Sequence, residues 1–159
     1  MPRITHTSQG FQIDGRRVWL LAAGMSYTRI PEELWAERLA AARQCGFNTI
    51  LTDAPWLVHE PRPGRYNFDQ AANIRRFLEL CKQQGLYVIL RIGPYVGNQY
   101  DGGGLPNWLT EIDGLRTREA NQPFIHRVTT YFRRLLSEVV EQQITRDGPL
   151  ILMQCEHAW

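Results

Sequence analysis

Apolar residues in this chain occur in two patterns, short unbroken runs and longer stretches with helical spacing. The runs at residues 18–24, 48–53, 87–90 and 149–154 predict strands that are buried on both faces, as in a sheet covered by helices. The stretches between them predict helices at residues 31–46, 74–85 and 124–140. This alternation of strands and helices predicts an α/β protein built from parallel βαβ units.

The first helix and the N-terminal segment have recognisable boundary residues. Pro31 suits a first helical position, and Gly46 suits the end of the same helix. Residues 11–18 predict a small hairpin with an Asp-Gly turn. We therefore divide the chain into an N-terminal hairpin segment, residues 1–17, and an α/β domain, residues 18–159.

Two architectures fit four strands that alternate with three helices, namely a small open doubly wound sheet and the first half of a closed (β/α)8 barrel. A nucleotide-binding sheet would have a glycine-rich phosphate loop after its first strand, whereas this chain has Ala23, Gly24 and Met25 there. Polar and aromatic residues instead follow every predicted strand, which is typical of the carboxyl-terminal rim of a barrel. We therefore predict a TIM-barrel domain of which only about the first four β/α units are present.

Composition restricts the partners and the compartment of the protein. A net charge of +2 without a basic stripe argues against nucleic-acid and membrane partners. The cysteines Cys45, Cys81 and Cys155 are odd in number and far apart, so we predict neither a disulfide framework nor a metal site. No segment resembles a signal peptide or a membrane span, so we expect a cytoplasmic protein.

Residues 87–109 form the most informative stretch, because a predicted buried strand opens there directly into a polar, aromatic and glycine-rich loop. Gly93 and Pro94 end this strand, since proline has no N–H to donate to a neighbouring strand. Similar residues follow the other strands, and parallel strands bring their carboxyl ends to one edge. The candidate rim residues are Tyr27, Arg29, Asp53, Trp56, Glu60, Tyr95, Asn98, Gln99, Tyr100, Glu156, His157 and Trp159.

Flat aromatic rings beside carboxylates and amides match what a sugar requires of its binding site. Pyranose rings present apolar C–H faces for stacking and hydroxyls for directed hydrogen bonds. Cleavage of a glycosidic bond then requires two carboxyl groups, about 5–5.5 Å apart for retention of configuration and farther apart for inversion. The rim therefore predicts a carbohydrate substrate and no cofactor. Structural roles stay open for single residues: Trp56 as a plug of the barrel end, and Glu60 as a partner of Arg62.

Five sequence motifs together resemble glycoside hydrolase family 35, the β-galactosidases with a TIM-barrel catalytic domain. The motifs are YTRIP at 27–31, PWLVHEPRPG at 55–64, LYVILRIGPY at 86–95, GGLPNWL at 103–109 and GPLILMQ at 148–154. The resemblance extends from about residue 11 to residue 159. It implies a retaining mechanism in which a glutamate after the fourth strand is the acid/base and a glutamate after the seventh strand is the nucleophile. It also implies a galactose site at the ends of the second, third and fourth strands.

The chain departs from the family pattern at functional positions. Asp53 stands where the family has tyrosine, and Gln99 stands where it has a sugar-binding glutamate. Ala158 occupies the usual acid/base position, and an alanine cannot donate a proton. Strand alternation places Gln154, Glu156 and Ala158 on one face. Glu156 is therefore our candidate acid/base, and an inert role in the inner layer of the barrel is the alternative.

The substrate-binding candidates are taken from the rim and the resemblance together. Alternation turns His157 towards the helices unless the strand ends before it, and a carboxylate such as Asp53 is required to hold its imidazole protonated near neutral pH. The full set comprises Tyr27, Arg29, Asp53, Trp56, Tyr95, Asn98, Gln99 and His157.

The family barrel has eight strands, and the sequence predicts four. A free half-barrel exposes two strand edges and its inner face, which favours self-association. We therefore interpret the chain as the N-terminal half-barrel of a β-galactosidase-like hydrolase whose nucleophile lies beyond residue 159. Two alternatives stay open: a non-catalytic carbohydrate-binding relative or inactive fragment, which Gln99 and Ala158 favour, and an unrelated small α/β enzyme.

Overall fold

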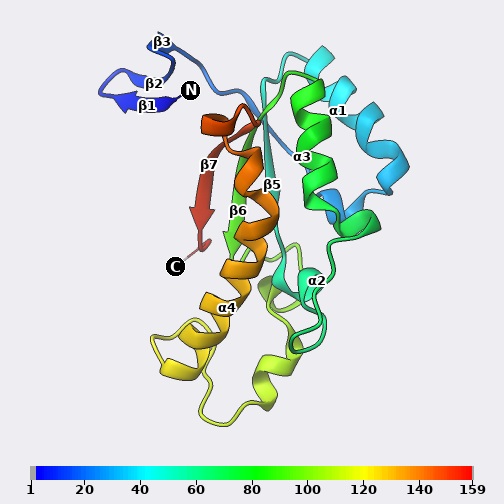
Figure 1. Cartoon of the computed structure of the whole chain (residues 1–159), viewed down its shortest axis with the longest axis vertical. Coiled ribbons are helices and arrows are strands. Elements are labelled where there is room, and N and C mark those ends of the chain that lie inside the picture. Colours follow the sequence, from blue (N-terminus) through cyan, green and yellow to red (C-terminus); the bar gives the residue numbers. More distant parts are fainter. Residues whose placement is uncertain (1–2, 159) are drawn as a thin grey trace.

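A parallel four-stranded sheet forms the centre of the protein, whose computed structural model describes residues 3–158 (Figure 1). The strand order is β4-β5-β6-β7, so every neighbour in the sheet is also the next strand of the sheet along the chain. The bounds are Ala22–Gly24 for β4, Thr49–Asp53 for β5, Tyr87–Gly93 for β6 and Leu150–Cys155 for β7. This order confirms the predicted parallel βαβ arrangement.

Helices cover one face of this sheet. Right-handed crossovers that always step to the next strand in the same direction place their helices on the same side. The main helices are α1 (Trp35–Gln44), α3 (Ile74–Gln83) and α4 (Gln122–Val139), and α2 (Trp56–His59) is a single turn after β5. Short 3₁₀ turns lie at Tyr27–Arg29, Glu32–Leu34, Gln70–Ala72, Asp101–Gly104, Asn107–Glu111, Val140–Gln142 and Ile144–Arg146. No helix in residues 3–158 is long and apolar enough to cross a membrane.

A separate antiparallel sheet precedes the parallel one and stands away from it (Figure 1). It contains the predicted hairpin, which pairs β2 (Gly10–Ile13) with β3 (Arg16–Arg17). A further strand, β1 (Ile4–Thr7), pairs with the other edge of β2 and was not predicted from the sequence.

The predicted strand at 18–24 was too long, because an asparagine side chain replaces part of the sheet ladder. The amide nitrogen of Asn48 donates to the carbonyl oxygen of Trp19 at 2.7 Å, and its oxygen accepts from the backbone N–H of Leu21 at 2.8 Å. These bonds satisfy the backbone before β4 begins. The first helix also begins later than predicted, because Pro31 is the N-cap of a 3₁₀ turn that precedes α1.

The core lies between the sheet and the helices, and aromatic rings dominate two parts of it. Tyr27 stacks on Phe77 with ring centroids 5.2 Å apart, and Trp35 meets both rings edge-on. Farther along the sheet, Trp56 stacks on Tyr131 at 4.8 Å. These pairs join α1, α3 and α4 to the loops that follow the strands, so the loops rest on a rigid base.

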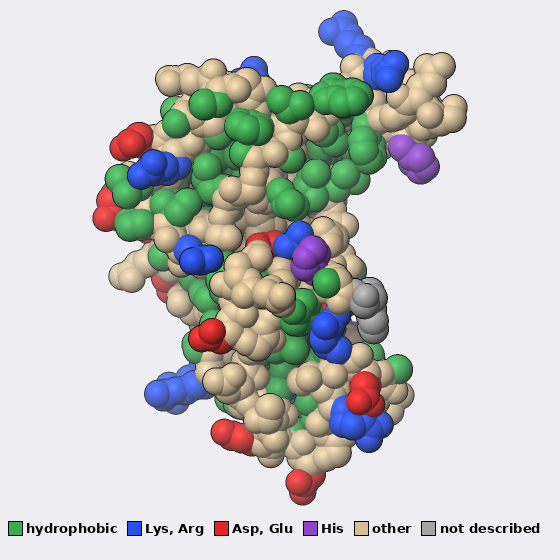
Figure 2. Space-filling view, turned by 180° about the vertical axis from the view of Figure 1, so that it is seen from behind, with side chains coloured by type: hydrophobic (Ala, Val, Ile, Leu, Met, Phe, Trp, Pro, Cys, Tyr) green, Lys and Arg blue, Asp and Glu red, His purple; other side chains and the backbone are tan. Residues whose placement is uncertain are grey.

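The other face of the sheet has no helix over it within the described chain. Register places Leu51, Ile89 and Leu152 side by side on this inner face, and all three are only half-buried. Apolar side chains are correspondingly gathered over the upper part of the surface when the molecule is seen from behind (Figure 2). This is the open inner face expected of a half-barrel.

Candidate active site

A buried ion pair lies at the carboxyl end of the sheet, where β5 and β6 run side by side. Asp53 and Arg91 are register partners, and Nη1 of Arg91 lies 2.8 Å from Oδ1 of Asp53. The next strand continues the row with Gln154, the register partner of Arg91. Since paired residues of parallel strands face the same side, all three side chains belong to the inner face.

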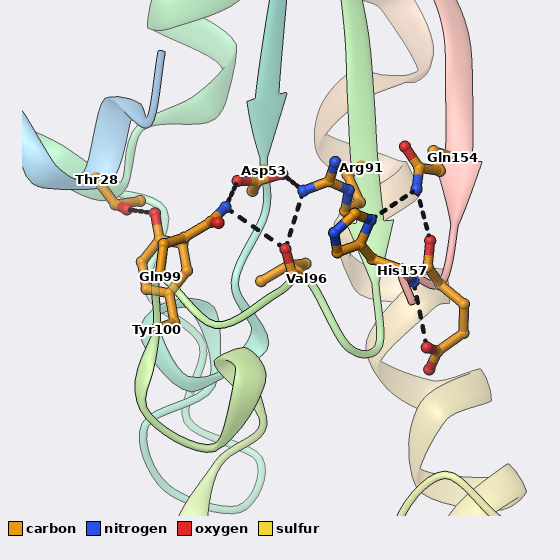
Figure 3. Close-up of polar contacts among 9 residues, drawn as sticks. Thr28, Asp53, Arg91, Val96, Gln99, Tyr100, Gln154 and His157 are labelled. Atoms are coloured by element: carbon orange, nitrogen blue, oxygen red, sulfur yellow. Dashed lines mark hydrogen bonds and ion pairs between the residues drawn. The ribbon is translucent and has the colours of Figure 1, made fainter. Parts of the chain in front are cut away.

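Gln99 completes this cluster from the loop after β6 (Figure 3). Its amide nitrogen donates to Oδ2 of Asp53 and lies 3.5 Å from the carbonyl oxygen of Val96. Arg91 donates to the same Val96 carbonyl at 2.9 Å. The loop is therefore held to the strand ends through the buried side chains of Asp53 and Arg91, while Gln99 itself is exposed.

The charge state of Asp53 reflects opposing influences. Burial raises the pKa of Asp53, while Arg91, Gln99 and the nearby His157 each act to lower it, and burial prevails. Removing either partner of the Asp53–Arg91 pair leaves an uncompensated buried charge, which typically costs about 3–5 kcal/mol. The pair therefore behaves as one unit.

The chain turns sharply after β7, and this changes where Glu156 points. The strand ends at Cys155, and the next residues include Glu156 with φ of 62° and Ala158 with φ of 55°. Strand alternation does not apply beyond Cys155, so it does not determine the direction of Glu156, Ala158 or His157. The interpretation that strand alternation continues through Glu156 to Ala158 was wrong, so alternation no longer supports an inward direction for Glu156.

The carboxylate of Glu156 contacts hydrogen-bond donors, and one of them comes from the long excursion before α4. Its oxygens lie 3.4 Å from the guanidinium of Arg118, 3.4 Å from the backbone nitrogen of Tyr95 and 3.3 Å from the backbone nitrogen of His157. The guanidinium of Arg118 also lies 4.0 Å from the centre of the Tyr95 ring and donates to the carbonyl oxygen of Ala158 at 2.6 Å. Arg118 therefore ties this excursion to the end of β7.

His157 lies between the end of β7 and the loop that holds Gln99 (Figure 3). Its Nδ1 lies 3.5 Å from the amide nitrogen of Gln154, which also donates to the carbonyl oxygen of Glu156 at 2.8 Å. A side chain at Gly97 would lie 3.1 Å from Cδ2 of the imidazole. The glycine thus permits the ring to lie close to the loop.

A comparison with protein families shows which family the chain belongs to. The model of the glycosyl hydrolases family 35 matches residues 10–159. The chain belongs to this family. The fold class predicted from the sequence, a TIM-barrel catalytic domain represented by its first β/α units, is also confirmed.

Curated relatives of the family 35 chain cover nearly its whole length. Human "Beta-galactosidase-1-like protein 2" is 38% identical over 94% of this chain and 23% of its own length. "Beta-galactosidase 11" of Arabidopsis thaliana is 35% identical over 98% of this chain and 19% of its own length. The chain therefore spans less than a quarter of each of these relatives.

Solved structures support the fold. An exo-β-1,4-mannosidase from Opitutaceae bacterium strain TAV5 superposes with a TM-score of 0.58 at 22% identity, covering 86% of this chain and 24% of that one. A GH5_18 protein from Bifidobacterium longum subsp. infantis gives a TM-score of 0.61 at 17% identity, covering 80% and 28%. At this level of identity the likeness concerns the fold alone.

The structure brings some of the predicted rim residues of this family 35 chain together and separates others. Asp53 and Gln99 meet directly, and His157 lies near them. Tyr95 and Asn98 form a second contact, in which the Tyr95 hydroxyl donates to Oδ1 of Asn98 at 2.5 Å. Gly103 lets this ring lie against the loop backbone, since a Cβ there would stand 1.8 Å from a Tyr95 ring carbon.

Four predicted rim residues, Tyr27, Arg29, Trp56 and Glu60, lie apart from the cluster. Tyr27 and Trp56 are fully buried in the core, so neither ring offers a face to a sugar in this arrangement. Trp56 donates to Glu60 at 2.7 Å, and Glu60 also accepts from the backbone of Gly64. The side chain of Arg29 is exposed and forms no hydrogen bond or ion pair with any described residue; only its backbone N–H donates a hydrogen bond, to the carbonyl oxygen of Ser26 at 3.1 Å. Trp159 lies outside the described residues.

Two arginines of the site were missed by sequence reasoning. Arg91 lies inside an apolar strand, and its charge in that position was a usable signal, since buried charges are paired or functional. Arg118 lies in an irregular excursion and is brought to Glu156 only by the tertiary fold. Among residues 3–158, no cluster of three or more side chains is suited to hold a metal ion.

Proposed function

We propose that this chain forms the first half of the catalytic barrel of a β-galactosidase-like glycoside hydrolase, which cleaves O-glycosidic bonds of a carbohydrate. The observation that carries the proposal is the match to glycosyl hydrolases family 35 over residues 10–159. The polar cluster around Asp53 and Gln99 supports it, because ligands of such barrels bind at the carboxyl ends of the strands.

Glu156 is the proposed proton donor in place of a glutamate at Ala158. Charge-assisted N–H···O⁻ bonds are typically about 2.7–2.9 Å long. The contacts of the Glu156 carboxylate are 3.3–3.4 Å, so its partners hold it loosely.

A non-catalytic carbohydrate-binding protein is the second candidate function. The methyl group of Ala158 at the usual acid/base position favours it, as does the engagement of Glu156 by donors. In that case the cluster around Gln99 binds sugar hydroxyls without bond cleavage.

The deciding experiment measures hydrolysis by the full-length protein. Activated aryl glycosides of several sugars, together with natural β-linked disaccharides, are assayed for turnover and, by calorimetry, for binding. Turnover of at least one glycoside supports the hydrolase. Binding without turnover of any substrate supports the carbohydrate-binding protein.

We further propose that residues 1–159 by themselves associate through the open inner face. Leu51, Ile89 and Leu152 are half-buried there, and apolar surface of this kind favours association in water. Within residues 3–158, the outer edges of β4 and β7 have no neighbouring strand, apart from a single bridge between Gln143 and Leu150 of β7, which allows strand pairing between copies.

A further inference from the structure

The side-chain amide of Gln99 is oriented by two hydrogen-bond acceptors. Its nitrogen donates to Oδ2 of Asp53 and lies 3.5 Å from the carbonyl oxygen of Val96. A carboxylate and a backbone carbonyl accept hydrogen bonds and donate none, so the nitrogen of the amide must face them. Both amide hydrogens then have an acceptor, and the orientation of the amide is determined.

The carbonyl oxygen of Gln99 is consequently available to a ligand. A Cβ atom at Gly97 would lie 3.2 Å from this oxygen and 3.1 Å from Cδ2 of His157, so both side chains lie close to the glycine and therefore on the same side of the loop. No donor within residues 3–158 bonds this oxygen, and Gln99 is exposed. Gln99 therefore presents one acceptor at the carboxyl end of the strands.

Arg91 holds both of the groups that orient Gln99. Its Nη1 lies 2.8 Å from Oδ1 of Asp53 and 2.9 Å from the Val96 carbonyl oxygen (Figure 3). The Arg91 and Asp53 side chains are only 9% and 6% exposed, so water and salt screen their attraction weakly. Each Asp53 oxygen already meets a protein donor, which gives this carboxylate a structural partner on both sides.

We propose that Asp53 and Arg91 are positioning residues for Gln99, whose carbonyl oxygen accepts a hydrogen bond from one hydroxyl of the substrate. The inference rests on the proposed glycosidase function and specifies how that site distinguishes sugars. The ion pair acts through the direction of the Gln99 amide and does not touch the substrate. A site built to bind a particular hydroxyl discriminates against analogues that lack it.

The test compares one glycoside that the full-length protein hydrolyses with its monodeoxy analogues, each lacking a single hydroxyl. For wild type, we expect one analogue to show a KM about tenfold above that of the parent glycoside, because its missing hydroxyl leaves Gln99 unpaired. Asp53→Asn is expected to raise the KM of the parent glycoside by a similar factor with little change in kcat. An asparagine at position 53 can donate as well as accept, so it no longer fixes the orientation of the Gln99 amide. The analogue that lacks the hydroxyl bound by Gln99 does not use this amide, so its KM should be the same in Asp53→Asn as in wild type.

A second set of variants keeps a carboxylate in the cluster, since Asp53→Asn leaves Arg91 without its counter-ion. Gln99→Glu places a second carboxylate next to that of Asp53, and their repulsion is expected to raise the KM of the parent glycoside. The double variant D53N/Q99E restores one carboxylate and one amide and is expected to recover most of this loss. Arg75→Met is the matched control: it removes a 3.0 Å ion pair to Glu138 on the helices, and neither constant should change.

The outcomes separate this inference from the function on which it rests. An equal rise of KM for the parent and for every analogue in Asp53→Asn assigns the pair a purely structural role and overturns the inference. A double variant no better than Gln99→Glu also overturns it. A folded wild-type protein that hydrolyses no glycoside overturns the proposed function, and the positioning role with it.

Discussion

The hydroxyl of Tyr27 lies 2.5 Å from Nε2 of His59, and both side chains are fully buried. On the opposite side of the imidazole, Nδ1 lies 3.0 Å from the carbonyl oxygen of Asn67. A carbonyl can only accept, so Nδ1 carries the proton and Nε2 accepts from Tyr27. Burial lowers the pKa of His59 to about 4, which leaves the ring neutral in the folded protein at neutral pH.

We therefore expect the protein to lose stability in mild acid. The ordinary pKa of His59 is 6.5, so below this pH the unfolded chain binds a proton that the folded chain binds only near pH 4. The contribution of neutral His59 to the free energy of unfolding is fully present above pH 6.5, and the free energy of unfolding falls by about 3 kcal/mol as the pH drops to 4. Urea unfolding across this range measures the loss.

His59→Gln should flatten that pH dependence, whereas His126→Gln should preserve it, because His126 is exposed on α4. If both variants lose stability in acid as steeply as wild type, other groups cause the effect.

Glu156→Gln tests the proposed proton donor in the full-length protein. We expect turnover of sugars with poor leaving groups to fall far more than turnover of activated aryl glycosides, because only the former need protonation. The ratio of kcat/KM in the variant to kcat/KM in wild type, determined for each substrate type, measures the difference. Glu141→Gln serves as the control, since Glu141 forms an exposed ion pair with Arg146 away from the strand ends. Equal losses on both substrate types would assign Glu156 a structural role.

The full-length protein is expected to hydrolyse simple aryl β-galactosides poorly. Asp53 offers only acceptors, and both of its oxygens meet protein donors, whereas a tyrosine offers a ring face and a hydroxyl. An unpaired sugar hydroxyl costs about 1–3 kcal/mol, enough to change which epimer binds.

The double variant D53Y/Q99E restores the family residues and should gain galactoside turnover by about tenfold or more. Neither single variant should gain, because Asp53→Tyr alone leaves Arg91 without a carboxylate and Gln99→Glu alone places two carboxylates next to each other. Steady-state assays of the wild type and the three variants test this, and efficient galactoside hydrolysis by wild type would contradict it.

Residues 1–159 expressed alone should self-associate. Leu152→Lys places a charge on the inner face and should shift the chain towards monomer, whereas Gln83→Lys on the exposed side of α3 should not. Sedimentation velocity over a range of concentrations measures the association. A compact wild-type monomer at all concentrations would contradict this prediction.

Local sequence patterns determined the framework of this protein. The spacing of apolar residues predicted the strands and helices with bounds that agree to within a few residues for β6 and for α4, whose N-cap is Asn121. The family motifs keep their order along the chain, so the barrel type and the family also followed from the sequence. Neither result requires knowledge of which distant residues meet.

Only the tertiary structure decided what the polar residues do. Asp53 meets Arg91 and Gln99 because parallel strands place their ends together, and Tyr27 turned out to be a core residue rather than a rim residue. The direction of the chain after Cys155 depends on a left-handed residue at Glu156, which a strand pattern does not reveal. Side-chain partners of this kind are set by long-range packing and desolvation, and the spacing of residues along the chain encodes neither.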